Sequence, residues 1–238
     1  MKKFLKNKKA LIASSLCLLI FITGAFAFMV SESNSIRNIF TVGSVGVKLT
    51  ENFNGETLEG GKTEDGETLV TEIQCAPNAT YQKEIFAEFT GKGEAFVYLK
   101  VEIPYLEVDI VDENGESTGE KQNAVQLNYS DDFDPTGITR DKGWALYDRF
   151  NAPELSQDGK TLTYVFMYKY NVNEENPKPE TSPIDSVSIA NMVIRDNDLI
   201  LDENGNPKSY DVKVTAYALQ DNGRFSDAGN VWRNFVNN

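Results

Sequence analysis

Histidine is absent from this chain of 238 residues. Without an imidazole, a Ser-His-Asp triad, a Cys-His dyad and an H-E-x-x-H zinc site are all excluded. A catalytic zinc ion with histidine ligands is excluded for the same reason. Carboxylate pairs, lysine bases and metal sites built from oxygen ligands are the options that remain. No catalytic constellation of these remaining kinds stands out in the chain. We therefore predict a protein that is not an enzyme, with no catalytic, cofactor-binding or metal-binding residues.

Acidic side chains are missing from the first 27 residues, which contain five lysines close to the start. An uncharged stretch, residues 10–30, follows the lysines and includes a run of small residues. A basic region, an apolar region and an A-x-A-like motif in this order are typical of a secretory signal peptide. We predict cleavage after Ala27, with Ala25 and Ala27 in the small-residue positions and Phe28 as the first mature residue.

The alternative interpretation of the same stretch is an uncleaved membrane anchor, because about 20 apolar residues can span a bilayer. In this case contact with a membrane would occur only through the uncleaved signal. Under either interpretation the remainder of the chain is expected outside the cytoplasm, secreted into an extracellular matrix or held at the cell surface.

Cysteine is scarce as well, with only Cys17 and Cys75 in the chain. Cys17 lies inside the predicted signal and is lost when the signal is removed. Cys75 then has no partner in its own chain, so stability has to come from a hydrophobic core. We expect Cys75 to be a buried thiol, although a bridge between two chains is an alternative.

Positive charge is in deficit after cleavage. Removal of five of the 23 basic residues leaves 18 against 36 acidic residues, which is a formal net charge of −18. A surface this acidic should repel nucleic acid and anionic lipid head groups. The composition therefore predicts no nucleic-acid partner and suits a soluble secreted protein.

Alternation of apolar and polar residues dominates the mature sequence and indicates β-strands. The clearest faces are Leu162, Tyr164, Phe166, Tyr168 and Tyr170; Val212, Val214, Ala216 and Ala218; and Val97, Leu99, Val101 and Ile103. Further strand-like segments are 39–49, 83–89, 106–111, 124–129, 144–150 and 186–194. Roughly nine strands separated by turns predict an all-β sandwich.

The connections between strands have their own signals. Asn-Gly pairs in 112–115 and 202–205 predict tight turns, and 173–183 is rich enough in proline to be a loop. Residues 52–68, rich in Gly, Glu and Thr, are also expected to be an exposed loop. One short helix is predicted at the end of the chain, capped by Ser226, with Ala228, Val231, Trp232 and Phe235 at helical spacing.

Three features leave a binding function open. The runs Asp131–Asp134 and Asp196–Asp198 could supply oxygen ligands to calcium, although neither has the order of an EF-hand loop. Asn78 and Asn128 stand in glycosylation sequons, which matter only in a host with that machinery. The aromatic residues of 161–170 could line a sugar groove, although at strand spacing we favour a place in the core. A cell-surface module that binds calcium or glycan is therefore the alternative prediction.

The end of the signal and the segment 38–49 resemble the start of the TasA/camelysin (CalY) family of exported proteins of Gram-positive bacteria. Similar segments follow in the same order along most of the mature chain. They are 77–103, with a proline turn, a glycine and an Ala-aromatic-Val strand; Gly143-Trp-Ala-Leu-Tyr147; 161–188, with a Tyr-rich strand; and Ala216-Tyr-Ala-Leu-Gln220 followed by Trp232.

The resemblance implies a jelly-roll sandwich that forms homo-oligomeric fibres in a biofilm matrix, after its signal is removed by a SipW-like peptidase. It also implies donor-strand exchange, in which residues 28–38 of one subunit complete a sheet of the next, with Phe28, Val30 and Ile36 as the apolar donor residues. The domain from 39 to 238 would then be the sandwich. The alternative is that residues 28–38 are a free terminus or pair within their own subunit. Some relatives are described as metallopeptidases, and because this chain has no histidine a metallopeptidase is the least favoured alternative.

Overall fold

The computed structural model of the protein describes residues 46–62, 66–136, 141–147, 153–193, 200–220 and 228–236. The predicted cleavage site at Ala25, Ala27 and Phe28 and the predicted donor residues Phe28, Val30 and Ile36 lie outside these residues. The same is true of Asp196–Asp198 and of the predicted cap Ser226.

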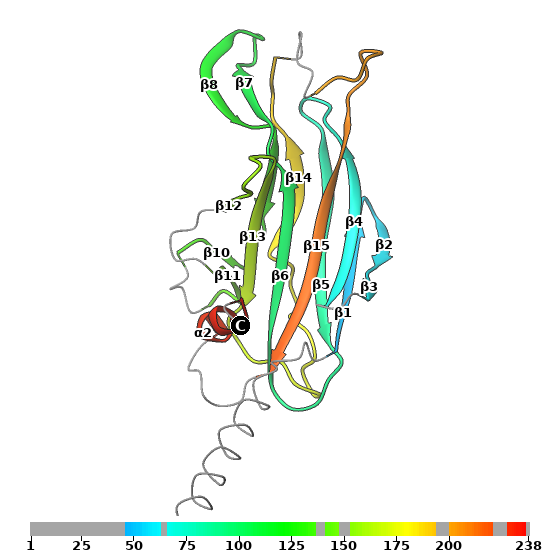
Figure 1. Ribbon diagram of the computed structural model, residues 1–238, viewed down its shortest axis with the longest axis vertical. Helices are drawn as coiled ribbons and strands as arrows, with labels where there is room; N and C mark the ends of the chain where they lie inside the picture. Colours follow the sequence, from blue (N-terminus) through cyan, green and yellow to red (C-terminus); the bar gives the residue numbers. More distant parts are fainter. Residues whose placement is uncertain are drawn as a thin grey trace, which may run out of the picture. The chain divides into compact units, whose positions relative to one another are not determined.

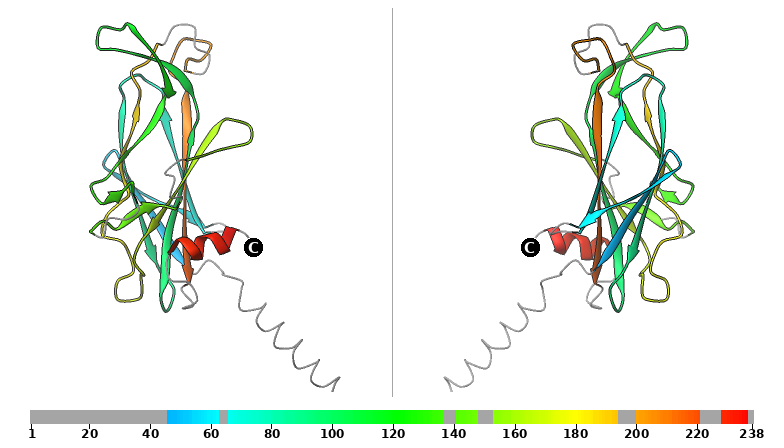
Figure 2. Two further views of the ribbon diagram at one scale, coloured as in Figure 1. Left: turned by 90° about the vertical axis from the view of Figure 1, so that its left-hand side faces the viewer. Right: turned by 90° about the vertical axis from the view of Figure 1, so that its right-hand side faces the viewer.

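Two sheets, antiparallel except for the parallel pair β10 and β11, pack face to face and make the predicted β-sandwich, as Figures 1 and 2 show from three sides. The first sheet has the strand order β2 (Glu56–Glu59), β1 (Val47–Phe53), β5 (Thr80–Phe89), β14 (Ile184–Ile189) and β9 (Val125–Tyr129). The second has the order β10 (Phe133–Asp134), β11 (Trp144–Leu146), β13 (Thr161–Tyr168), β6 (Ala95–Pro104), β15 (Ser209–Gln220), β4 (Glu67–Gln74) and β3 (Gly61–Lys62). The short strand β12 (Glu154–Leu155) also pairs with β13, and β7 (Glu107–Val111) and β8 (Ser117–Asn123) form a separate hairpin.

The strand pairings are nested in the manner of a jelly roll. Strand β4 pairs with β15, β5 pairs with β14, and β6 pairs with β13, all antiparallel. Early strands therefore pair with late strands in reverse order, as they do when one long hairpin is rolled into two sheets. This topology confirms the expected jelly-roll-like sandwich. Strand β1 is an addition that lies beside β5.

The predicted inward faces form the core between the sheets. Val97, Leu99, Val101 and Ile103 of β6 are buried, as are the four predicted inward residues of β15. Burying these alternating apolar side chains contributes roughly 25 cal/mol for each Å² removed from water. The period-two pattern thus places the side chains that hold the two sheets together.

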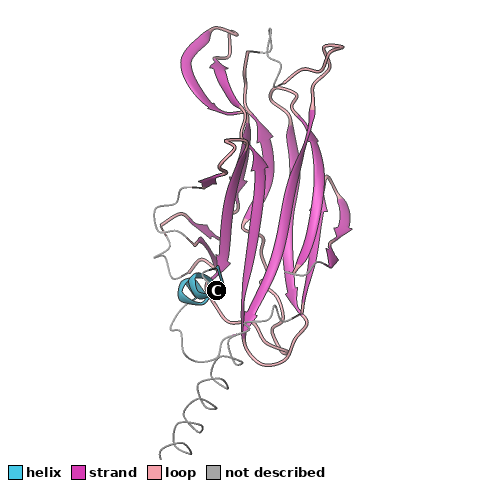
Figure 3. Ribbon diagram, viewed as in Figure 1, coloured by secondary structure: helices cyan, strands magenta, loops and turns pink. Residues whose placement is uncertain are grey.

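The single helix of the described chain, α2 (Ala228–Val236), covers part of the outer face of the second sheet (Figure 3). The ring of Trp232 lies 4.9 Å from the ring of Tyr98 and 5.3 Å from that of Tyr217. The Tyr98 hydroxyl donates a hydrogen bond of 2.6 Å to the carbonyl oxygen of Ala228. The predicted C-terminal helix is therefore confirmed, and it buries aromatic residues that the alternation assigned to solvent. Within the part of the chain that the structure describes, no helix has the length and apolar character needed to cross a membrane.

Two predictions about local structure are wrong. The described residues of 52–68 are mostly strand and not loop: Asn54 and Gly55, with φ angles of 49° and 87°, connect β1 to β2 in a tight hairpin. Positive φ at both central residues is the geometry that an Asn-Gly pair favours in such a turn. Tyr170 does not continue the inward face of β13, because the strand ends at Tyr168 and the Tyr170 side chain is 48% exposed.

Candidate functional site: unpaired strand edges

The backbone of β9 has a free edge at the end of the five-stranded sheet. The N–H of Ser130 donates to the carbonyl of Pro183, and the N–H of Ala190 donates to the carbonyl of Ala124. Because N–H and C=O groups point to the same side at every second residue of an antiparallel pair, the even-numbered residues of β9 face β14. Leu127 and Tyr129 therefore direct their backbone groups away from β14, where the described chain places no further strand.

Aromatic side chains lie beside this free edge, and we call Tyr129, Phe133, Tyr164 and Phe166 the edge aromatic cluster. The Tyr129 ring stacks on Phe133 with 4.2 Å between centroids, and Phe166 lies 5.6 Å from Phe133 and 6.2 Å from Tyr164. Phe166 is fully buried, whereas the Tyr129 side chain is 41% exposed although it points inward. The core is therefore incompletely covered at this edge.

The phenol groups of this cluster lie in a poorly solvated place. Burial raises the pKa of Tyr164 to about 12, and the nearby phenol of Tyr129 adds to this shift. Burial also raises the pKa of Tyr129. A phenolate is disfavoured when it loses water, so both tyrosines are neutral near pH 7. They act here as apolar rings with a polar tip, and Phe166 confirms the prediction that the aromatic face of β13 contributes to the core.

A second free edge belongs to β4 in the other sheet. The N–H of Cys75 donates to the carbonyl of Lys208, so odd-numbered residues of β4 face β15. Strand β3 pairs only with Glu67 and Thr68, and Gln74 forms its outward hydrogen bonds with the hydroxyl of Tyr81. Val70 and Glu72 therefore have outward backbone groups that no described strand pairs.

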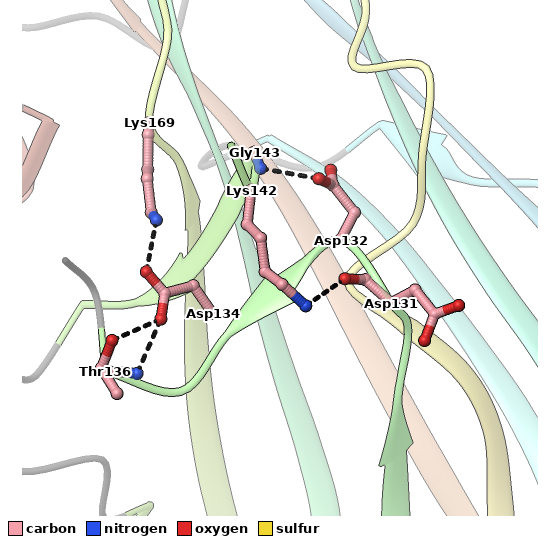
Figure 4. A network of polar contacts seen from close by, with 7 residues as sticks. All are labelled: Asp131, Asp132, Asp134, Thr136, Lys142, Gly143 and Lys169. Atoms are coloured by element: carbon pink, nitrogen blue, oxygen red, sulfur yellow. Dashed lines mark hydrogen bonds and ion pairs between the residues drawn. The ribbon is translucent and has the colours of Figure 1, made fainter. Parts of the chain in front are cut away.

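The acidic run Asp131–Asp134, a candidate calcium site in the sequence, makes hydrogen bonds and an ion pair within the domain (Figure 4). The buried carboxylate of Asp134 accepts from Lys169 Nζ at 2.7 Å and from the N–H and hydroxyl of Thr136. Asp132 accepts from the N–H of Gly143 at 2.8 Å, and the carbonyl of Asp131 accepts from Lys142. These bonds fasten β10 and β11 beside β13. Across the described ranges, no group of three or more Cys, Asp and Glu side chains is placed to hold a metal ion.

The structure also describes the other residues that the sequence singled out, which are Cys75, Asn78 and Asn128. Cys75 is fully buried and is the free thiol that we expected. Asn78 lies in a turn and its amide donates to Asn191, whereas the amide of Asn128 donates to Ser186 across the outer face of the first sheet. The sequence did not point to the free edge at Leu127 and Tyr129, because an edge is defined by which strands pair over long distances.

Comparison with known proteins adds nothing to this description, since no family model, no curated protein and no solved structure matches the chain.

Proposed function

We propose that this protein is a secreted structural protein that polymerises into extracellular fibres of a bacterial biofilm matrix. In this proposal a SipW-like peptidase removes the signal after Ala27. Residues 28–38 of one subunit then add as a strand to a sheet edge of the next subunit. The sequence features that support it are the export signal, the resemblance to the TasA/camelysin proteins and the absence of histidine.

The observation that carries the proposal is the free edge of β9 beside the half-exposed ring of Tyr129. An unpaired strand edge is a template for another strand, because its N–H and C=O groups supply hydrogen bonds in a fixed pattern. Exposed apolar side chains next to the edge supply the pockets that such a strand fills. A contact between the terminus of one copy and the edge of another is head-to-tail, and when it does not close it produces a filament.

The donor segment has the composition that this role requires. Phe28, Val30 and Ile36 all fall on one face of an extended strand, since they are separated by two and six residues. The residues between them are mostly polar, so the segment is a poor core strand for its own domain.

The test is electron microscopy of purified protein that begins at Phe28, at moderate salt, beside a variant that begins at Ile39. We expect fibres from the first protein and none from the second, while both give the same β-rich circular dichroism and cooperative melting. A matched pair, Val30→Pro and Val30→Ala, isolates the backbone: both remove the valine side chain, but only the proline removes a ladder donor and should reduce assembly further.

Two results would contradict the proposal. Fibres of unchanged width and repeat from the truncated protein would show that residues 28–38 are not the donor. Failure of the truncated protein to fold as a monomer would show that this segment belongs to its own domain and is not available to another subunit.

A further inference from the structure

A complete jelly roll has four strands in each sheet, and the described residues of this domain supply seven of the eight. Strands β4, β15, β6 and β13 occupy the four positions of one sheet. The corresponding positions of the other sheet hold β5, β14 and β9, and the described chain leaves the fourth position, beyond β9, without a strand. After β9 the chain crosses to the other sheet, where β10 and β11 extend the edge beyond β13.

The side chains that a fourth strand would cover are the ones left partly exposed. The inward residues of β13 include Leu162 and Tyr164, which are only half-buried, in contrast to the fully buried inward residues of β6. Tyr129 is 41% exposed at the same place. A strand added beside β9 would therefore remove apolar surface from water as well as pair the backbone.

A strand added at the free edge of β4 would remove little apolar surface from water. The inward residues of β4, Leu69, Thr71 and Ile73, are already buried, with exposures of 7%, 5% and 1%. A strand added there would gain backbone hydrogen bonds but would cover little core. Hydrogen bonds alone exchange with water at small net gain, so the two edges differ in the hydrophobic contribution.

We infer that the acceptor edge of this protein is β9, and that its occupant is the N-terminal segment 28–38 of a second copy, in the fourth position that the described chain leaves without a strand. This inference rests on the proposed function. The segment runs antiparallel to β9, as neighbouring strands do in both sheets of the jelly roll.

The register follows from the two free backbone positions. Residues opposite one another in an antiparallel pair share a face, so the residues opposite Leu127 and Tyr129 point inward. They must be apolar and two apart, and in the donor segment this pattern occurs at Phe28 and Val30. Val30 then lies opposite Leu127, and Phe28 lies opposite Tyr129 beside the edge aromatic cluster.

The free edge of β9 does not extend to Val125 at the start of the strand. The side-chain amide of Asn123 donates a hydrogen bond of 2.6 Å to the carbonyl of Val125 and a second bond of 3.0 Å to Pro104. The outward carbonyl of Val125 is therefore already paired within the domain. The donor leaves the edge after Ser31, which keeps Glu32 out of the core.

A proline substitution tests the edge itself. Tyr129→Pro removes the outward N–H of β9, which the ladder with β14 does not use, so the domain should fold. Tyr129→Ala removes the same ring and keeps the N–H. We expect fibre elongation to be about tenfold slower for the proline variant than for the alanine variant. Val70→Pro, the matched change on the β4 edge, should leave elongation unchanged.

A mixing experiment with cysteines tests the partner and the register. Met29 and Asn128 face each other in a non-hydrogen-bonded pair, where side chains are close enough for a disulfide. Protein carrying Met29→Cys mixed with protein carrying Asn128→Cys should give covalent dimers under oxidation, and Met29→Cys mixed with Glu72→Cys should not.

The outcomes separate this inference from the function on which it rests. If wild-type mature protein forms no fibres, the proposed function fails. If fibres form but Tyr129→Pro elongates like Tyr129→Ala, or the covalent dimers appear with Glu72→Cys alone, the function stands and β9 is not the acceptor. If a chain carrying both Met29→Cys and Asn128→Cys closes on itself as a monomer, the occupant is the protein's own terminus and not a second copy.

Discussion

The ammonium nitrogen Nζ of Lys83 lies 2.5 Å from Oε2 of Glu51, and both side chains are completely excluded from solvent. They take inward positions on β5 and β1, between the two sheets. The hydroxyl of Thr71 donates to the other carboxylate oxygen of Glu51 at 2.8 Å and accepts from Lys83 at 3.0 Å. Burial lowers the pKa of Lys83, and the opposing charge of Glu51 limits this shift. Two charges thus occupy a site where the neighbouring strands place apolar residues.

Replacing one member of this pair should be far worse than replacing both. Lys83→Met leaves the carboxylate of Glu51 buried without its counter-charge, and we expect a loss of about 3–5 kcal/mol in the free energy of unfolding. The double variant Glu51→Leu with Lys83→Met removes both charges and should return to within about 1–2 kcal/mol of the wild type, or exceed it. Urea denaturation measures all three proteins. A double variant as unstable as the single one would mean that the pair is needed for the fold itself.

The thiol of Cys75 supplies a dependence of stability on pH with a defined sign. Burial raises its pKa from 9.0 to about 11. The folded protein therefore keeps a proton that the unfolded chain loses, so stability is unaffected below pH 9 and falls as the pH rises toward 11. Urea denaturation at pH 8 and pH 10.5 should give a smaller difference for Cys75→Ala than for the wild type. Alkylation by iodoacetamide at pH 8.5 should be slow until urea unfolds the protein, because the reactive form is the thiolate.

Gly143 is a position where no side chain fits. A Cβ atom there would lie 2.6 Å from Cε2 of Tyr168 and 2.7 Å from Oδ2 of Asp132. Gly143→Ala should therefore lower the free energy of unfolding by about 1–3 kcal/mol, the usual cost of overpacking. Gly61→Ala is the control, because the nearest atom to its Cβ is the carbonyl oxygen of Thr68 at 3.9 Å. Thermal unfolding of the two variants side by side should separate them, and equal melting temperatures would refute the steric argument.

The strands and their inward faces could be predicted from the sequence where alternation was strong, as along β6 and β15. The prediction failed for β2, because its residues are exposed or half-exposed on both faces and carry no alternation; the Asn-Gly pair at 54–55 was the signal that could have located the hairpin. Lys83 lies on the inward face with Ile85, so the buried ion pair needed only its partner, which comes from another strand. The free edge of β9 could not be predicted either, because which strands pair is decided by residues that are far apart in the sequence.

Assembly of the mature protein should depend strongly on salt if it forms fibres as proposed. Its formal net charge of −18 makes every addition of a subunit an encounter between like charges. The screening length falls from about 30 Å at 0.01 M salt to about 8 Å at 0.15 M, so repulsion between subunits weakens over this range. We expect fibre growth, followed by light scattering, to accelerate with sodium chloride and to respond in the same way to potassium chloride. Growth that slows with salt would indicate that attraction between opposite charges, and not apolar and backbone contact, holds the subunits together.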